Sequence, residues 1–428
     1  MWKWFEKVIQ IFKISDLRKK ILFVLGILVV FRIASNIPVP GVDTAALSRF
    51  FERNQFFGLL NVFSGGAMEH MSIVMLGLGP YITATIIMQL LTMIFPGMEA
   101  LYKEEGEAGR QKFNQYSRIL TVPLAALNAY GMLVILTRQN VLGQLTFMNW
   151  VTAIVVISGG AVFLMWLGEL ISEKGIGNGV SLLIFAGIVS RVPSSIGQMV
   201  LSYSADKIPA YLGFFVVAII IIIGVVLINE GRRNIPVSYA KRIRGNRMYG
   251  GVSTYLPLNV NPAGVIPIIF ALSIMLFPGM VGSFMAASSN VMMAKIGNFL
   301  AGSFQNPWFH GVSYFILVVL FTYFYTAVTF DPKNIANNMQ KMGGFIPGIR
   351  PGKSTSDFLY YILNRVLLFG ALFLGAIAIL PSVVQGATGV QAFGFIVGGT
   401  SLLIVVSVVL ETMRQVESQL TMRDYEGF

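Results

Sequence analysis

Residue types that commonly carry out chemistry are scarce in this chain. It has no cysteine and only two histidines, His70 and His310. A disulfide framework and a thiolate metal site are therefore ruled out, and a histidine metal centre is not expected. No H-E-x-x-H or G-x-S-x-G pattern occurs either, so neither a zinc protease nor a serine hydrolase is indicated. We expect no catalytic residue, no metal and no cofactor.

Two glycine-rich stretches match nucleotide-binding loops only in part. Gly352–Ser354 could end a phosphate loop, but Pro347 stands where the G-x-x-x-x-G-K-[ST] pattern requires glycine. The run Gly175–Gly179 reads G-x-G-x-G and lacks the G-x-G-x-x-G spacing of dinucleotide-binding loops. We interpret the first as a cytoplasmic turn and the second as a tight, closely packed turn between two helices.

Three charged residues lie close to long apolar segments: Arg32, Glu169 and Glu411. Each is near the end of its segment, where a long side chain can reach the membrane surface. A proton- or ion-coupled transporter usually carries an ionisable residue near the middle of the membrane. The middle parts here are mostly Leu, Ile, Val, Gly and Phe, which disfavours such a transporter.

The elements that hold these residues must lie in an apolar environment. Of the 428 residues, 55% are hydrophobic and 12% are charged, and this charged fraction is about half that of a soluble domain. So little polar surface cannot cover a water-soluble particle. Only helices or closed barrels satisfy backbone groups in lipid, and the apolar runs lack the alternation of barrel strands. We therefore expect an all-α, polytopic membrane protein.

Ten apolar segments are candidates for membrane-spanning helices, which need about 20 residues each. The first is expected to remain uncleaved, because residues 36–40 are a poor signal-peptidase site. The first and fifth are the weakest candidates, since Arg32 lies in one and Arg191 and Pro193 interrupt the other. The segments are Ile21–Ala34, Ser72–Phe95, Ile119–Leu136, Thr152–Ile171, Val180–Val200, Tyr211–Ile228, Ala263–Val281, Val312–Phe330, Tyr360–Leu380 and Phe393–Leu410.

The distribution of positive charge predicts the topology. Most of the 31 Lys and Arg residues lie in the N-terminal tail, the even-numbered loops and the C-terminal tail, and the positive-inside rule places these parts in the cytoplasm. Ten helices divide into two groups of five, the second inverted relative to the first. The expected parts are a cytoplasmic tail (1–20), an N-terminal half (21–201), an external hinge (202–210), a C-terminal half (211–410) and a cytoplasmic tail (411–428).

Two long cytoplasmic loops, 229–262 and 331–359, are rich in positive charge. Such charge is in part a topology signal, and the net charge of +12 also suits anionic lipid, ribosomal RNA or an acidic partner. Both loops are longer than a simple connection needs, and long loops often carry function. Arg350 stands between turn-forming residues, which would display it at a loop tip for a large cytoplasmic partner.

The external segment Asn61–Met71 leads directly into the second apolar segment. Gly65 and Gly66 would break or hinge a helix there. Taken on its own composition, the segment is more simply interpreted as a linker.

A series of short motifs runs in order from about Leu17 to Leu410. They are Phe63–Ala67, Gly79–Ile82, Met165–Glu169, Gly175–Gly179, Tyr239–Arg242, Leu256–Leu258, Ala263–Pro267, Pro347–Gly352, Phe393–Gly394 and Gly398–Ile404. Together with the ten apolar segments, they resemble the SecY family of protein-translocation channel subunits. The resemblance is specific because many separate motifs agree, although none of them would suffice alone.

The resemblance implies a clamshell of helices 1–5 and 6–10 around an hourglass pore in the bacterial inner membrane. It replaces the linker interpretation with a plug on the external side, made of Asn61, Val62, Phe63, Ser64, Gly65, Gly66, Ala67, Met68, Glu69 and His70. It also implies an apolar pore ring of Leu78, Ile82, Val180, Ile184, Ile269 and Ile404. The residues alone leave open that these six are ordinary helix-packing side chains.

Further sites and partners follow from the same resemblance. Helices 2 and 7 would form a lateral gate to lipid, near Thr83 and Phe277. A motor or ribosome would dock on the cytoplasmic loops at Arg350, Lys241, Arg242, Arg244 and Arg247. The implied partners are SecE, SecG, the motor ATPase SecA, the ribosome with its RNA, signal peptides, nascent polypeptides and anionic lipids.

The chain departs from the common family pattern at two places. Met68–His70 adds a charge and a titratable ring to the plug, where we expect His70 to be a solvated residue, with a pH-sensing plug as the alternative. Ser238 replaces a frequent Asn before the Tyr239–Arg242 run. Neither change touches the ring or Arg350, so only details of the plug are affected.

A passive conduit is the function that these observations favour. A pore that passes every kind of side chain needs an apolar lining to which the passing chain does not bind. A narrow apolar constriction also closes to ions by excluding water. Two alternatives stay open at this point. A secondary transporter would show saturable flux of a small solute, and an insertase without a through-pore would show no channel conductance.

Overall fold

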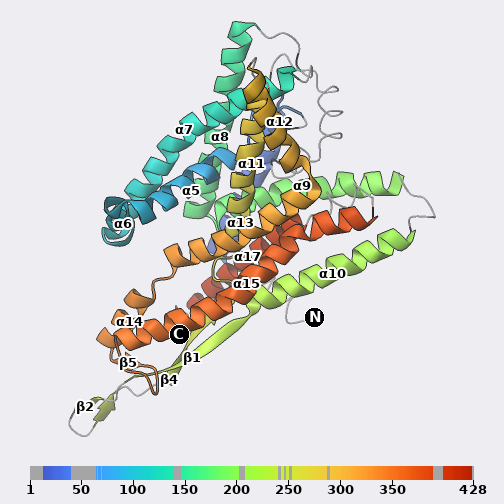
Figure 1. Ribbon diagram of the computed structural model, residues 1–428. Helices are drawn as coiled ribbons and strands as arrows, with labels where there is room; N and C mark the ends of the chain where they lie inside the picture. The colour runs from blue at the N-terminus through green and yellow to red at the C-terminus, as the bar shows by residue number, and fades with distance from the viewer. Residues whose placement is uncertain are drawn as a thin grey trace.

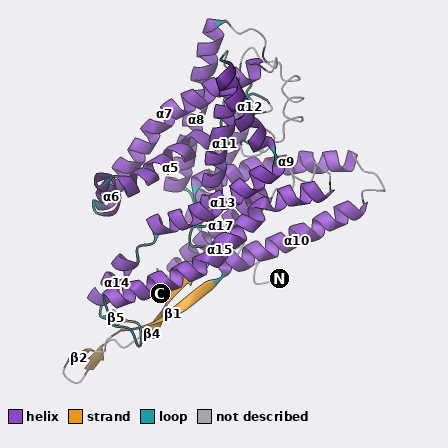
Figure 2. Ribbon diagram, viewed as in Figure 1, coloured by secondary structure: helices purple, strands orange, loops and turns teal. Residues whose placement is uncertain are grey.

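The structure is a computed structural model of the chain. It describes residues 13–39, 64, 66–68, 70–138, 142, 146–201, 208–239, 242–244, 247–249, 253–286, 290–388 and 399–426. The described chain is a bundle of long helices that carries a narrow β-ribbon at one end (Figures 1 and 2).

The described residues are mostly helical, as predicted, and a helix overlaps each of the ten apolar segments expected from the sequence. In chain order the helices are α2 (Ser15–Ala34), α5 (Gly79–Ile94), α7 (Gly106–Arg138), α8 (Phe147–Lys174), α9 (Gly179–Leu201), α10 (Ile208–Glu230), α11 (Ile266–Ala286), α13 (Pro307–Thr329), α15 (Lys353–Thr388) and α17 (Gly399–Glu426). Residues 393–398, where the tenth segment begins, and most of the expected hinge lie outside the described residues.

Several described helices are suited to a lipid bilayer. Among the described residues, 4 helical stretches are each long and apolar enough to cross a bilayer alone. They are Gly106–Thr137, Phe147–Lys174, Trp308–Lys341 and Lys353–Leu380. The count rises to 5 if α5 and the short helix α6 (Pro96–Lys103), bent by 110° at their junction, form one span. Shorter apolar helices include Phe215–Glu230 and Ile266–Met275. The chain is a multi-pass membrane protein.

The outer face of α10 illustrates why the exterior must meet lipid. Its side chains Leu212, Phe215, Ile220 and Leu227 are 65%, 67%, 62% and 67% exposed in the isolated chain. Contiguous apolar surface of this kind is rare on a soluble monomer and marks contact with a membrane or a partner. Lipid or a partner subunit therefore covers this face.

The second long helix begins later than its apolar segment. The segment starts at Ser72, but α5 starts at Gly79 and residues 73–78 form turns. Pro80 suits the first turn of a helix because proline has no N–H to leave unpaired. Before the helix, the N–H of Ile73 donates to the carbonyl of Ile37 over 3.0 Å, so this stretch follows the end of the first helix.

The all-α expectation is wrong for the loop 229–262. There β1 (Arg232–Tyr239) and β4 (Ser253–Asn259) form an antiparallel ribbon, continued at its far end by β2 (Arg242–Arg244) and β3 (Arg247–Tyr249). Figure 2 shows this ribbon extending away from the helices. Ile235 and Val237 alternate with exposed residues along β1 and are buried, which is the period of a strand with one covered face.

The second long loop, 331–359, packs against this ribbon. It contains the helix α14 (Pro332–Lys341) and the short strand β5 (Gly344–Phe345), which pairs with the end of β1. Asp331 caps α14, because its carboxylate accepts hydrogen bonds from the N–H groups of Lys333 and Asn334. A cluster of apolar side chains joins both loops to α15, and its buried members are Ile235, Val237, Leu258, Met339, Ile346, Leu359 and Ile362. We call this unit the cap.

Two further apolar clusters hold the bundle together. The larger contains residues of α2, α5, α8, α9, α10, α11, α13, α15 and α17, so it joins the first and second groups of helices. The smaller lies between α7 and α8 and includes Met68, Met71 and Met75. An additional helix, α12 (Val291–Gln305), packs on α11 in the loop that we expected to be external.

Candidate functional site

The six proposed ring residues meet in the larger apolar cluster. Five of them, Leu78, Ile82, Ile184, Ile269 and Ile404, are between 0% and 8% exposed, and all five belong to this cluster. The sixth, Val180, is partly buried and packs against it. These side chains come from the beginning of α5 and from α9, α11 and α17, and α5 contacts α11 while α9 contacts α17. The structure therefore brings together residues from four helices.

Leu78 and Ile82 lie on one helix face, although Leu78 precedes the helix. Leu78 is the N-cap of α5, and its carbonyl accepts a hydrogen bond from the Ile82 N–H over 3.0 Å. This is the first helical hydrogen bond, so the two side chains are one turn apart. Val180 and Ile184 have the same spacing within α9.

The glycine run between α8 and α9 is the tight turn expected from the sequence. Gly177 has a φ of +93°, and its N–H donates to Oε1 of Gln415 on α17 over 2.8 Å. A Cβ atom on Gly179 would lie 1.8 Å from the carbonyl oxygen of Gly168. Only glycine allows so close an approach of two backbones, and this approach positions the beginning of α9 with Val180.

The segment that we expected to form a plug packs against the same region. Of the ten proposed plug residues, Ser64, Gly66, Ala67, Met68 and His70 are described, whereas residues 61, 62, 63, 65 and 69 are not. The described ones form turns, in which the N–H of Ser72 donates to the Ala67 carbonyl over 2.8 Å.

The burial of this segment differs from that of a solvated linker. Ala67 is 0% exposed and belongs to the cluster that holds the ring residues. Met68 is 5% exposed and belongs to the cluster between α7 and α8. His70 is exposed, as expected for a solvated residue. The segment is thus packed between the ring cluster and the first group of helices.

The proposed gate residues lie on two helices in contact. Thr83 is half-buried on α5, where its hydroxyl donates to the Gly79 carbonyl over 3.0 Å. Phe277 lies on α11, but its side chain is outside the described part of the structure. The structure thus shows that α5 and α11, the helices of the expected gate, are packed together.

Arg350 is exposed on the cap. Gly348 and Gly352 flank it with φ values of +84° and +97°, and the Thr355 hydroxyl donates to the Arg350 carbonyl over 2.9 Å. Nearby Ile346 is 3% exposed and anchors the turn in the cap. A tight, anchored turn therefore presents this guanidinium at the surface.

The other proposed docking residues lie at the far end of the ribbon (Figure 1). Arg242 and Arg244 belong to β2, and Arg247 belongs to β3, opposite Arg244. Lys241 is outside the described residues, as are the side chains of these arginines. The backbone places the three arginines within one short hairpin.

The charged residues near helix ends have local partners. Arg118 on α7 donates to Glu169 on α8 over 2.7 Å, and Arg32 donates to the Ser190 hydroxyl over 3.3 Å. Glu411 instead lines a cavity of about 220 Å³ between the end of α10 and the middle of α17. Partial burial raises the pKa of the Glu411 carboxyl, which lies just beyond the expected span, and nearby Arg414 opposes part of this rise.

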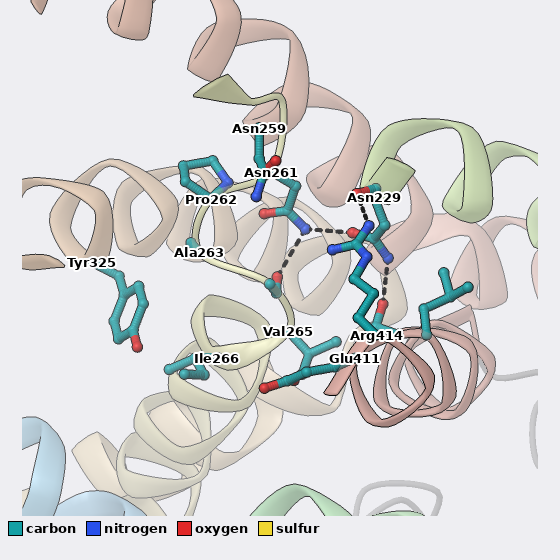
Figure 3. A pocket seen from close by; sticks show the side chains of 13 residues that line it. Asn229, Asn259, Asn261, Pro262, Ala263, Val265, Ile266, Tyr325, Glu411 and Arg414 are labelled. Atoms are coloured by element: carbon teal, nitrogen blue, oxygen red, sulfur yellow. Dashed lines mark hydrogen bonds between the residues drawn. The ribbon is translucent and has the colours of Figure 1, made fainter. Parts of the chain in front are cut away.

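Sequence reasoning missed the polar network around this cavity (Figure 3). The Asn229 side-chain amide donates to Ser407 over 2.7 Å, and the Asn261 amide donates to Asn229 over 2.8 Å. Arg414 donates to the Asn229 carbonyl and to Glu230, each over 2.6 Å. These residues are far apart in the sequence, and the only local signal is the pair of asparagines just before α11.

Comparisons with known proteins agree with the fold and with the motifs. The SecY family model matches residues 72–413. The protein translocase subunit SecY of Corynebacterium glutamicum is 44% identical over 98% of this chain and 99% of its own length. The protein of the same name from Mycobacterium tuberculosis is 44% identical over 96% of this chain and 97% of its own length.

Solved structures share the fold at lower identity. One is a structure described as a protein conducting channel, with a TM-score of 0.61, 20% identity and coverage of 92% of this chain and 91% of that one. Another is an idle yeast Ssh1 complex bound to the 80S ribosome, with a TM-score of 0.65, 14% identity and coverage of 94% and 89%. At these identities the structures support the fold, whereas the family rests on the sequence relatives. With its motifs, helices and near full-length relatives in agreement, this chain belongs to the SecY family.

Proposed function

We propose that this chain is the pore-forming subunit of a protein-translocation channel. It would pass unfolded polypeptides across the bacterial inner membrane and release apolar segments sideways into lipid. The observation that carries the proposal is the apolar ring, in which six side chains from four helices of both halves meet, with Ala67 of the plug buried in the same cluster.

The chemistry of the ring suits a conduit for chains of any sequence. Leu78, Ile82, Val180, Ile184, Ile269 and Ile404 have no hydrogen-bonding group in their side chains, so a passing polypeptide finds no binding site among them. A narrow apolar constriction also excludes water and ions when nothing occupies it. Such exclusion matters because one charge crossing 100 mV releases about 2.3 kcal/mol. The plug would add a second barrier on the external side.

In this proposal all ten long helices span the membrane in two inverted halves, 21–201 and 211–410, joined by the hinge 202–210. The charge distribution supports placing both termini, the tails 1–20 and 411–428, and the cap on the cytoplasmic side. Thr83 and Phe277 would line the lateral gate between α5 and α11. The packing of α5 on α11 supports this assignment.

Energy for transport would come from partners, since the sequence contains no complete nucleotide-binding motif. We assign docking of a SecA motor or a ribosome to Arg350 and to the hairpin residues Lys241, Arg242, Arg244 and Arg247. One structural neighbour is described as ribosome-bound, which supports this assignment. SecE and SecG would cover part of the exposed apolar exterior, and anionic lipid would neutralise the basic cytoplasmic face.

Deletion of Phe63–Met71 tests this function. The purified channel is reconstituted in a planar bilayer, and single-channel currents are recorded beside translocation of a secretory protein into vesicles. We expect the deletion to produce ion conductance while translocation continues. Saturable flux of a small solute without protein transport would identify a transporter. A correctly folded deletion variant with no conductance would contradict the proposed plug and pore.

A further inference from the structure

The helix α12 presents an apolar face that no described part of the chain covers. Val291, Met292 and Phe299 are 81%, 74% and 75% exposed. Met292 and Phe299 lie on the side of the helix opposite Gly297, which is buried against the end of α11. A helix whose outer side meets water normally carries polar residues there, so water is not the medium that this face suits.

The sequence around α12 is almost free of charge. Lys295 is the only Lys, Arg, Asp or Glu residue between Met248 and Phe330. It is exposed on the same side of the helix as Met292 and Phe299. A lysine can keep its apolar stem among apolar neighbours while its ammonium group reaches a polar layer above them. The face therefore matches a surface that is apolar below and anionic above, as a phospholipid leaflet is.

The helix is too short to cross a membrane. Its 15 residues rise about 22 Å, whereas the hydrocarbon core of a bilayer is about 30 Å thick. Short apolar helices are usually buried in a core or lie at a membrane interface. The exposure of Met292 and Phe299 excludes the first of these for their side of α12.

The chain passes from α12 directly into a helix that can span a membrane. Only Asn306 separates α12 from α13, and its side chain accepts a hydrogen bond from the Trp308 N–H over 3.0 Å. Trp308 is 76% exposed, and tryptophan is enriched at the boundary between membrane and water. The exposed side chains Val312, Ile316 and Leu320 follow along α13. Hence α12 ends where the lipid-facing surface of α13 begins.

The helix is fixed in place by its neighbours, and Figure 1 shows it beside α11. A Cβ atom on Gly297 would lie 2.0 Å from the backbone nitrogen of Ala286, the last residue of α11, and only glycine permits so close an approach. Asn290 caps α12, because its side chain accepts a hydrogen bond from the Met292 N–H over 3.0 Å. The apolar face is thus held outward by a formed helix.

We propose that the apolar face of α12 inserts into the external leaflet of the membrane, with the ammonium group of Lys295 among the lipid phosphates. This inference rests on the proposed topology, which places the loop between α11 and α13 outside. Because α12 packs on α11, the contact would also hold the external end of this gate helix at the lipid surface.

Collision measurements on spin labels test the contact. The chain contains no cysteine, so the assembled channel can carry one label, at Met292→Cys or Phe299→Cys, in vesicles of phosphatidylethanolamine and phosphatidylglycerol. Oxygen concentrates in lipid and a nickel chelate stays in water, so their relative collision rates report the depth of the label. We expect both labels to lie about 5–10 Å below the headgroups. Ile220→Cys on α10 and Ser253→Cys on β4, both exposed, serve as the lipid and water standards.

A matched pair of acidic substitutions tests the same contact by a second route. With the label at position 292, Phe299→Asp places a carboxylate in lipid and should move the label toward water by most of its depth of about 5–10 Å. Asn298→Asp makes the acidic change beside the apolar face and should move the label less. Both side chains are exposed, so neither substitution should disturb folding.

Two outcomes would overturn the proposal. Labels at 292 and 299 that collide with the nickel chelate as freely as at position 253 would show that water covers the face. Shielding of both labels from oxygen and chelate alike would show that a protein, either a second copy or another partner, covers it. The topology is tested separately, because labelling of Ser303→Cys only from the cytoplasmic side would contradict the external placement of this loop even with both labels in lipid.

Discussion

The backbone N–H of Gly177 donates a hydrogen bond to Oε1 of Gln415 over 2.8 Å. Gly177 lies in the turn between α8 and α9, and Gln415 lies on α17, so the bond joins the two groups of helices. The turn also positions Val180, whereas α17 carries Ile404. This contact therefore connects two of the elements that supply the proposed ring.

Replacing Gly177 should loosen this contact. Gly177→Ala places an L-residue at a φ of +93°, with its Cβ 2.9 Å from Leu182 Cδ1, and left-handed backbone alone costs such a residue about 1–2 kcal/mol. We expect a lower thermal midpoint for the purified protein in detergent. Gly26→Ala is the matched control, because nothing lies within 4 Å of its added Cβ and alanine is favoured within a helix. An unchanged midpoint for Gly177→Ala would show that the turn is not tightly constrained.

The asparagine network should contribute measurably to stability. Asn229 is 8% exposed, and its side chain donates a hydrogen bond to Ser407 and accepts one from Asn261. Asn229→Leu leaves these groups without their partner, and each unsatisfied buried group costs about 1–3 kcal/mol. We expect a clear loss of thermal stability. Asn337→Leu, on the exposed face of α14, should change stability by less than about 0.5 kcal/mol. Similar midpoints for the two variants would mean that the network is dispensable.

Charge reversal at the cap should separate docking from folding. Arg350→Glu changes an exposed side chain on an anchored turn, so the stability should change by less than about 0.5 kcal/mol. Motor-driven and ribosome-coupled translocation should fall sharply, because a carboxylate would repel an acidic docking surface. Lys341→Glu makes the same charge change elsewhere in the loop and should have a smaller effect. Near-normal translocation by an assembled Arg350→Glu channel would exclude the docking role.

Cysteine labelling tests the two-half topology. A single cysteine can be added without background reaction, because the chain has none of its own. An impermeant thiol reagent should label Ser238→Cys or Ser354→Cys only from the cytoplasmic side. It should label Ser204→Cys or Ser303→Cys only from outside intact cells. Labelling of position 354 from the outside would refute the ten-helix arrangement.

The helices could be predicted from sequence because each needs a long apolar run, and such runs are visible without neighbours. The late start of α5 could not be found in this way, since residues 72–78 are as apolar as the helix that follows. It depends on Pro80 and on the turns that precede it. The ribbon was missed because the loop 229–262 was assessed for its charge, although Ile235 and Val237 already alternate with exposed residues.

The site was predictable only where a resemblance supplied residue roles. The spacing of Leu78 and Ile82 indicates one helix face, but their convergence with Ile269 and Ile404 depends on tertiary packing. The cavity had no sequence signal of its own. Asn229, Tyr325 and Glu411 come from separate elements and line it together only in the folded chain.

The central claim is that the buried apolar ring lines a pore. The most direct test measures ion conductance of Ile82→Asn and Ile269→Asn channels in bilayers beside their thermal unfolding. In a pore, the new amide meets water on one side, so we expect small changes in stability together with an open, conducting resting channel. In a solid core, an unpaired buried amide costs about 1–3 kcal/mol and opens no path for ions. Destabilised variants without added conductance would contradict the pore.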